Sequence, residues 1–199
     1  MERSAPTGVP IHDLLRARWS PRAIDPDRLV TAAQVAVLIE AARWAPSCYN
    51  EQPWRFLVFD GSDPAALARA RDCLVEGNAW ARRAPVLLLS VAFESFRRNG
   101  KPNRHAQHDV GLASENLALQ AAAGGLAVHM MAGFDAERAR REFHIPEGFT
   151  PMAMIAVGFP ASPDLLPAPL RERELAPRER LPVSEIAFAG GWSRPARGG

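Results

Sequence analysis

A run of small side chains between residues 107 and 123 constrains the fold of this chain more than any other feature. Glycine, alanine and serine recur along it, as at Gly111, Ser114 and Ala118, and Gly124 and Gly125 follow directly. Its length and the closing glycines predict one long helix. Because small side chains let a second element approach closely, we expect either the central helix of a domain or a seam between two subunits.

Length and composition set further limits. The chain has 199 residues, 47% of them hydrophobic, and no shift in composition divides it, so we expect a single domain over residues 1–199. A net charge of +2 gives no support for nucleic-acid binding through bulk electrostatics. The N-terminus has no continuous apolar segment, and no window approaches the ~20 apolar residues of a membrane span. We therefore expect a cytoplasmic protein with no membrane or nucleic-acid partner.

The rest of the chain alternates helical patterns with short apolar strands. Thr31 begins a helix through a capping box with Gln34, and Asp63 with Pro64 begins another that is expected to reach about Glu76. The other expected elements are a short helix at 10–18, strands at 55–60, 85–93, 126–131 and 151–158, a helix at 135–143 and a loop at 96–104.

The tail from about residue 160 to 199 has a different character. It is rich in proline and arginine and lacks periodicity until residues 183–188, which bring the expected strand count to about five. Such a segment cannot build a core of its own, so it must lie on another surface. Arg178 and Arg180 are two residues apart, and in an extended chain they point to the same side.

The segment Pro46–Trp54, which reads P-S-C-Y-N-E-Q-P-W, has the properties of a ligand loop. The preceding helix must end before Pro46 and a strand follows, so both flanks are rigid. Ser47, Asn50 and Gln52 both donate and accept hydrogen bonds, which suits a planar heterocycle whose edge alternates N–H and C=O groups. The alternative is an ordinary polar turn whose side chains satisfy their own backbone.

A second candidate is the segment R-W-S-P-R-A-I-D, in which Arg18, Ser20 and Arg22 follow the first short helix. Two guanidinium groups this close repel each other unless they share an anion, and a phosphate would satisfy both. The alternative is a solvated basic patch paired with Asp25 or Asp27.

Three smaller features complete the candidates. Asn78 follows a glycine before a central strand, where a helix cap is a simple interpretation. Gly133, in a tight strand-to-helix turn after Ala132, exposes backbone N–H groups, although a plain connection has the same pattern. His105 and His108, near the start of the long helix, are candidates for substrate contact or solvated loop histidines.

No set of side chains indicates catalysis by the protein itself. The sequence lacks a Ser-His-Asp order, paired carboxylates in a loop, a Walker loop, a G-x-G-x-x-G motif and any Cys or His spacing typical of a metal site. Cys48 and Cys73 are expected to be free thiols. Phosphate binders and amides without a reactive group suit a flavin, because the isoalloxazine performs the chemistry.

Three segments in the right order resemble the FMN-dependent nitroreductase family. P-S-C-Y-N-E-Q-P-W is similar to the family's P-S-S-x-N-x-Q-P-W, R-W-S-P-R-A-I-D to its R-x-S-x-[RK]-x-F-D, and residues 109–126 to its central helix. The resemblance implies an α+β three-layer sandwich with a mostly antiparallel sheet flanked by helices. It also implies an intertwined homodimer, with FMN at the subunit interface and the C-terminal tail exchanged onto the partner.

The resemblance also implies which residues hold FMN. Many relatives have Glu where this chain has Ala132, but the flavin contact there is made by the backbone and is expected to survive. The implied contacts are Arg18, Trp19, Ser20, Arg22, Arg178 and Arg180 for the phosphate and ribityl chain, Pro46, Ser47, Cys48, Asn50, Gln52 and Asn78 around the ring, and Met131, Ala132 and Gly133 beside flavin N5.

The implied activity is a ping-pong reaction. NADH or NADPH reduces the flavin at N5 and leaves, and a small-molecule acceptor such as a nitroaromatic, a quinone or an enone then takes its place. No catalytic side chain is assigned, because flavin N5 is the reacting atom. One alternative is a flavin-binding carrier or regulator without turnover. Another is a narrower relative that reduces a small aldehyde or dehalogenates an aromatic ring.

Overall fold

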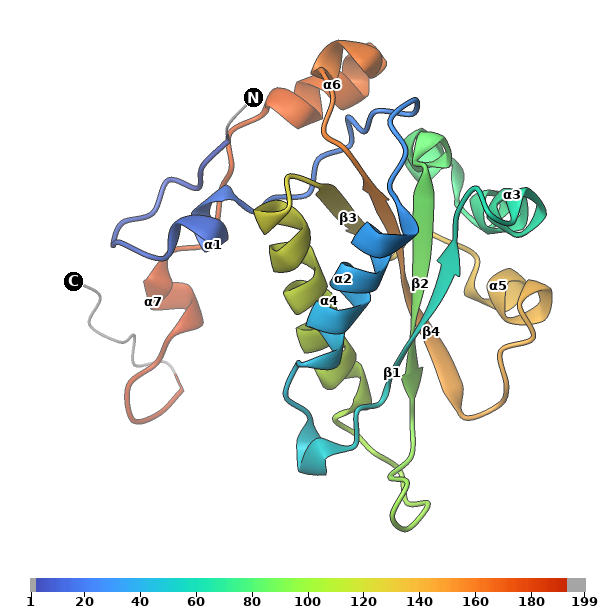
Figure 1. The fold of residues 1–199 in the computed structure, drawn as a ribbon. Coiled ribbons are helices and arrows are strands. Elements are labelled where there is room, and N and C mark those ends of the chain that lie inside the picture. Colours follow the sequence, from blue (N-terminus) through green and yellow to red (C-terminus); the bar gives the residue numbers. More distant parts are fainter. Residues whose placement is uncertain (1–2, 193–199) are drawn as a thin grey trace.

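Four strands form one sheet in the computed structural model, which describes residues 3–192 of the chain. The strands β1 (Trp54–Phe59), β2 (Val86–Phe93), β4 (Phe149–Gly158) and β3 (Ala127–Met131) lie side by side in that order, and each neighbouring pair is antiparallel (Figure 1). The expected α+β class with an antiparallel sheet is confirmed. The expected count of about five strands is wrong for the described residues, because residues 183–186 of the tail are helical.

The second strand is the centre of the core. Val86 and Leu88 face one buried cluster and Leu87 and Leu89 face the other, and none of the four is more than 1% exposed. A strand covered on both faces has a continuous apolar run instead of an alternating one. This is why the sequence V-L-L-L predicted a central strand.

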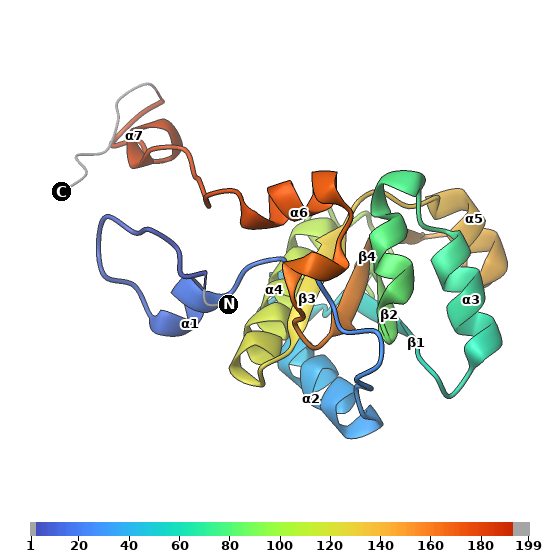
Figure 2. The ribbon, with the colours of Figure 1, turned by 90° about the horizontal axis from the view of Figure 1, so that it is seen from above.

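Helices cover both faces of the sheet and give three layers. One face is covered by α2 (Ala32–Arg43) and α4 (Ala106–Ala123). The other is covered by α3 (Pro64–Asp72), α5 (Ala136–Glu142) and a 3-10 helix (Glu76–Arg83) (Figures 1 and 2). The expected flanking of the sheet by helices is therefore confirmed.

The long helix rich in small residues is the central helix of the domain. Ala113, Leu117, Ala118 and Ala121 of α4 are each at most 2% exposed and lie in the core between α2 and the sheet. Small side chains on this face let α2 and the sheet approach α4 closely. Whether α4 also forms a seam with a second subunit stays a prediction.

The expected end of α3 is wrong. The helix stops at Asp72 instead of about Glu76, and Asn78 lies inside the following 3-10 helix instead of at a helix cap. Tertiary pairing causes the break, because Leu74 forms a β-bridge with Phe134 and the backbone of an α-helix cannot extend into such a bridge.

The tail has more regular structure than its composition predicted. It contains a one-turn 3-10 helix (Pro163–Leu165), α6 (Ala168–Leu175) and the short α7 (Val183–Ile186). The expectation of a tail without regular structure before residue 183 is therefore wrong. The reason lies in α6, which buries Glu174 against the same chain at 1% exposure and so docks the first half of the tail.

The second half of the tail lies beside the N-terminal arm, which contains α1 (Asp13–Ala17). Figures 1 and 2 show α1 and α7 together at one side of the molecule, away from the sheet. Arg178 joins them, because its Nη1 donates to the carbonyl oxygens of Arg3 at 2.6 Å and Arg16 at 2.8 Å. Among residues 3–192, no helix is long and apolar enough to cross a bilayer.

Replacing Leu88 with Ala is expected to lower the free energy of unfolding by roughly 2–5 kcal/mol, because the side chain is fully buried and its removal leaves a cavity. Chemical denaturation measures the change. The matched control is Leu29→Ala, at a side chain that is 75% exposed, where a change within about 0.5 kcal/mol is expected. Equal losses in both variants would contradict the described core.

Candidate functional site

Residues 18–25, which we call the arginine segment, lie between α1 and the sheet and contain three candidate residues that lie close together. Arg18 donates from Nη1 to Ser20 Oγ at 3.4 Å, and its Nε lies 3.3 Å from Glu115 Oε1 of α4. Trp19 lies between them in sequence, and the guanidinium of Arg3 lies 5.0 Å from the centre of its ring. The segment is therefore tied both to the central helix and to the N-terminal arm.

Arg178 and Arg180 join the same cluster. Burial lowers the pKa of Arg178, and the charges of Arg18, Arg180 and Arg3 lower it further, so these three guanidinium groups lie near that of Arg178. The Nη2 of Arg178 also donates to the backbone oxygen of Arg18 at 2.9 Å. Four cations gathered in this way fit a doubly charged phosphate, which would relieve their repulsion.

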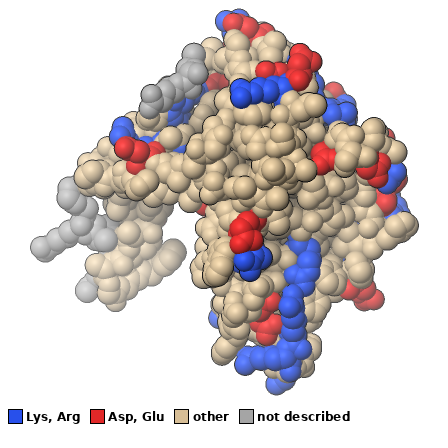
Figure 3. Space-filling model, viewed as in Figure 1, with Lys and Arg blue, Asp and Glu red and all other residues tan. Residues whose placement is uncertain are grey.

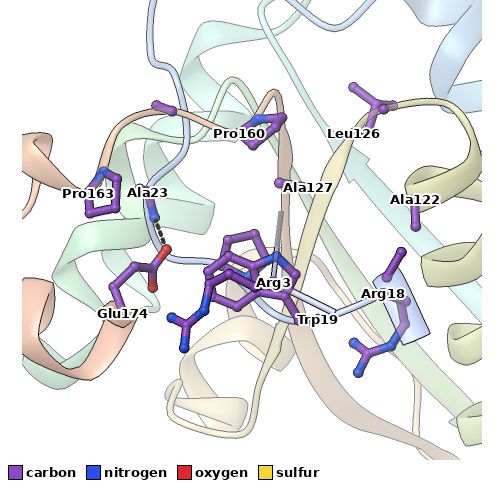
Figure 4. A pocket seen from close by; sticks show the side chains of 14 residues that line it. Arg3, Arg18, Trp19, Ala23, Ala122, Leu126, Ala127, Pro160, Pro163 and Glu174 are labelled. Atoms are coloured by element: carbon purple, nitrogen blue, oxygen red, sulfur yellow. Dashed lines mark hydrogen bonds between the residues drawn. The ribbon is translucent and has the colours of Figure 1, made fainter. Parts of the chain in front are cut away.

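Arg22 is held differently. Its guanidinium lies 3.8 Å from a carboxylate oxygen of Glu174, and its backbone N–H donates to both oxygens of that carboxylate at 2.9 and 3.0 Å. The N–H of Ala23 donates to it at 3.0 Å (Figure 4). Arg22 is therefore paired with Glu174 and is not among the neighbours that shift the pKa of Arg178.

Glu174 is a residue that sequence reasoning missed. It belongs to α6 in the tail, 152 positions from Arg22, and no local pattern marks it. Its side chain lines a hollow of about 190 Å³ together with Arg18 and Trp19 (Figure 4). The tail thus forms part of the frame of the arginine segment.

His129 and Trp80 form a second link that the sequence did not reveal. His129, on β3, has its Nδ1 3.1 Å from the carbonyl oxygen of Pro21, and its ring centre lies 4.7 Å from that of Trp80. A carbonyl only accepts, so Nδ1 is the protonated nitrogen of the neutral ring. Burial lowers the pKa of His129 to about 4, and the nearby positive charge of Arg22 also lowers it.

The strand-to-helix turn after β3 meets Asn78. The side-chain amide of Asn78 donates to the carbonyl oxygen of Gly133 at 2.9 Å. A Cβ on Gly133 would lie 2.5 Å from that amide nitrogen, so any larger residue would displace the Asn78 side chain from this contact. Met131 is buried at the end of β3, and Ala132 is exposed beside the turn. Asn78 and the predicted turn therefore form one unit.

The loop that begins at Pro46 has an unusual backbone. Tyr49, Asn50 and Gln52 have φ angles of +52°, +57° and +50°, which cost energy for residues other than glycine. Ser47 stabilises the loop by accepting a hydrogen bond at Oγ from the N–H of Gln52 at 3.0 Å. Asn50 is exposed, and its side-chain amide is available to a ligand.

A buried carboxylate fixes this loop to the start of α4. Asp109 is 2% exposed, and its Oδ2 accepts a hydrogen bond from the N–H of Cys48 at 2.9 Å. Its Oδ1 lies 3.1 Å from Nδ1 of His108. His105 and His108 line a hollow of about 260 Å³ with Pro46, Ser47 and Cys48. Both histidines therefore lie beside the loop, as substrate contact would require.

The candidate residues thus form two groups in one chain. The first group contains the arginine segment, Asn78 and the turn at Gly133, which lie along β3 at one edge of the sheet, together with Arg178, which is bound to the backbone of Arg18. The second group is the loop that leads into β1 at the other edge. Three strand spacings separate these edges, which is about 14 Å. The two groups therefore lie at opposite edges of the sheet.

Comparison with known proteins decides the family. The model of the Nitroreductase family matches residues 15–159. The chain belongs to the nitroreductase family. A solved structure described as an oxidoreductase containing FMN is 34% identical to it, has a TM-score of 0.89 and is matched over 96% of each chain.

Two curated relatives are similar to most of the chain. Protein DrgA of Synechocystis is 30% identical over 175 residues, which cover 73% of this chain and 82% of DrgA. An NADH dehydrogenase of Thermus thermophilus is 27% identical over 182 residues, which cover 76% of this chain and 82% of that protein. As a member of the nitroreductase family, the chain is an oxidoreductase.

A pH-dependent stability is expected from His129. The pKa of His129 in the fold, about 4, lies below the ordinary value of 6.5. The contribution of the neutral ring to the free energy of unfolding is therefore complete above pH 6.5 and is lost as the pH falls toward 4. The unfolded chain binds a proton in that window and the fold does not. The loss should reach up to about 3 kcal/mol. Denaturation of wild type and His129→Gln between pH 4 and 7.5 measures it, and the difference between them should shrink as the pH falls.

Replacing Glu174 with Ala should leave two backbone N–H groups without acceptors and release α6. We expect the free energy of unfolding to fall by about 3 kcal/mol. Limited proteolysis should then cut the tail between residues 160 and 180 more quickly. The control is Glu172→Ala, an exposed position in the same helix, where neither quantity should change. An unchanged cleavage rate in Glu174→Ala would argue against the docking of α6.

Proposed function

We propose that the protein is a homodimeric, FMN-dependent oxidoreductase that takes electrons from NADH or NADPH and reduces small electron-poor acceptors such as nitroaromatics, quinones or enones. The observation behind this proposal is the division of the candidate flavin contacts between two edges of one sheet. We propose that the first group of one chain and the loop of a second chain, related by a two-fold axis, close around the same ligand, so that each chain lends its loop to the other.

The first group suits the phosphate end of FMN. Arg18, Arg178 and Arg180 contribute guanidinium groups that bind phosphate through charge-assisted hydrogen bonds. Ser20 adds a hydroxyl beside Arg18. Arg22 acts on this site through its pairing with Glu174, which holds the backbone of the segment in place.

The second group suits the ring. The loop offers the amides of Asn50 and Gln52 and the backbone of Ser47 and Cys48, while the turn at Gly133 contributes backbone groups from the other subunit. When bound, FMN supplies the redox chemistry, accepting two electrons from the nucleotide and passing them to the acceptor. The protein then has to orient the ring and leave one face open.

The arm and the tail suit contact with a second subunit. Both lie at the same side of the molecule in Figure 2, and both carry exposed apolar side chains. Ile11 and Leu15 are 41% and 47% exposed, and Val183 and Ile186 are 55% and 64% exposed. Four apolar side chains exposed on neighbouring segments are typical of a protein interface. We propose that they cover the partner subunit, with the tail exchanged.

The visible spectrum of the purified protein tests this function. We expect a dimer with bound FMN whose absorbance is bleached by NADH or NADPH under anaerobic conditions and restored by a quinone or a nitroaromatic. Replacing Arg18 with Ala removes a charge-assisted contact, so the dissociation constant of FMN should rise roughly 10- to 100-fold. The control is Arg141→Ala, an exposed residue of α5.

Two results would count against the proposal. A protein that takes up no FMN would exclude both the cofactor and the reaction. Bound FMN that neither nucleotide bleaches would leave only flavin binding, as in a carrier or a regulator.

A further inference from the structure

The loop between β2 and α4 is strongly basic. Residues 96–104 include Arg97, Arg98, Lys101 and Arg104 and no acidic residue. Among residues 3–192, nine ion pairs are formed, and none includes any of these four side chains or Arg55. In Figure 3 a band of basic side chains runs down the lower end of the molecule, where this loop lies in Figure 1.

This basic loop has a defined shape. The N–H of Phe96 donates to the carbonyl oxygen of Lys101 at 2.8 Å, and the N–H of Gly100 donates back to the carbonyl oxygen of Phe96 at 2.8 Å. Ser95 and Pro102 form a β-bridge below this turn. The backbone that presents the four cations is therefore fixed by hydrogen bonds.

The basic loop is also fastened to the candidate flavin loop. The carboxylate of Glu51, 8% exposed, accepts at Oε2 from the N–H of Arg97 at 2.8 Å. The guanidinium of Arg98 lies 3.9 Å from the centre of the Tyr49 ring, and the ring of Phe96 packs edge-on to Tyr49 at 6.0 Å. A cation over an aromatic face is attracted by the ring, so Arg98 is held against Tyr49 of the candidate flavin loop.

Like charges gather here without an ion pair among the described residues. Burial lowers the pKa of Arg55, and the positive charge of Arg97 lowers it further. The Glu51 carboxylate faces the backbone N–H of Arg97 and forms no ion pair with either guanidinium within 4.0 Å. Such a group of cations at the rim of a site attracts an anionic ligand and is stabilised when one binds.

We propose that the basic loop binds the phosphate groups of the pyridine nucleotide and, through the 2′-phosphate, makes the enzyme prefer NADPH over NADH. This inference rests on the proposed function. The nicotinamide must reach a ring held by residues 46–52, so the charged remainder of the nucleotide must lie on the adjoining surface. The adjoining surface is the basic loop. NADPH has one more dianionic group than NADH, and it gains more from unpaired cations.

The test is the reductive half-reaction, followed by anaerobic stopped-flow bleaching of the bound FMN with NADPH and with NADH. The wild type should bind NADPH more tightly. In the double variant with Arg98→Gln and Lys101→Gln, the dissociation constant of NADPH should rise roughly tenfold. The dissociation constant of NADH should rise by less than about threefold. The bleaching rate at saturating nucleotide should stay the same.

Matched variants separate a local effect from net charge. Arg141→Gln combined with Arg173→Gln removes two exposed charges from α5 and α6 and should change neither constant. Lys101→Gln combined with Arg104→Gln leaves the contact between Arg98 and Tyr49 intact and should still weaken NADPH selectively. In the wild type, adenosine 2′,5′-bisphosphate should compete with NADPH better than AMP does, which requires no variant.

Three results would overturn the proposal. Equal affinities for NADPH and NADH, unchanged in both loop variants, would reject the loop as a nucleotide site while leaving the oxidoreductase intact. The loop would instead be assigned to anionic acceptors if those variants bound 4-nitrobenzoate more weakly while their binding of nitrobenzene and of NADPH stayed unchanged. FMN that neither nucleotide bleaches would remove the proposed function and this inference together.

Discussion

The candidate site depends on the hydrogen bonds between the Glu174 carboxylate and the backbone N–H groups of Arg22 and Ala23. A buried carboxylate is costly unless its oxygens are paired, and here two backbone donors and the Arg22 guanidinium stabilise it. In return, the bonds fix the path of the chain directly after Arg18 and Ser20. The docking of the tail and the shape of the arginine segment are therefore one structural property.

The pairing of Arg22 with Glu174 also decides which arginines remain for a ligand. Arg22 is paired with Glu174 and Arg18 with Glu115, so Arg178, Arg180 and Arg3 provide the positive charge that no ion pair balances among the described residues. Arg178 uses three of its five N–H donors on the carbonyl oxygens of Arg3, Arg16 and Arg18, which leaves two for a ligand. It can bridge the arm, the tail and a phosphate at once. If Arg22 pointed toward Arg178 instead, Glu174 would be buried without a cation beside it.

Local signals predicted the elements that depend on local chemistry. The capping box at Thr31, the apolar run of β2 and the small residues of α4 all formed as expected. The end of α3 could not be predicted, because the bridge between Leu74 and Phe134 joins residues 60 positions apart. Glu174 and His129 give no sequence signal for the same reason, since their partners at Arg22 and Pro21 lie more than 100 positions away. The motifs predicted two groups of candidate site residues, but not that these groups lie at opposite edges of the sheet.

A buried carboxylate that accepts from backbone N–H groups occurs at each of the three candidate segments. Glu174 holds the arginine segment, Asp109 holds the loop at Cys48, and Glu51 holds the basic loop at Arg97, and each of these carboxylates is at most 8% exposed. All three accept from backbone N–H groups, so they fix the main chain and leave neighbouring side chains available to ligands. Glu174 also pairs with the Arg22 guanidinium, whereas neither Asp109 nor Glu51 forms an ion pair with an arginine or a lysine among the described residues. At these two carboxylates backbone amides take the place of a cation, so the arginines of the basic loop stay available at the surface.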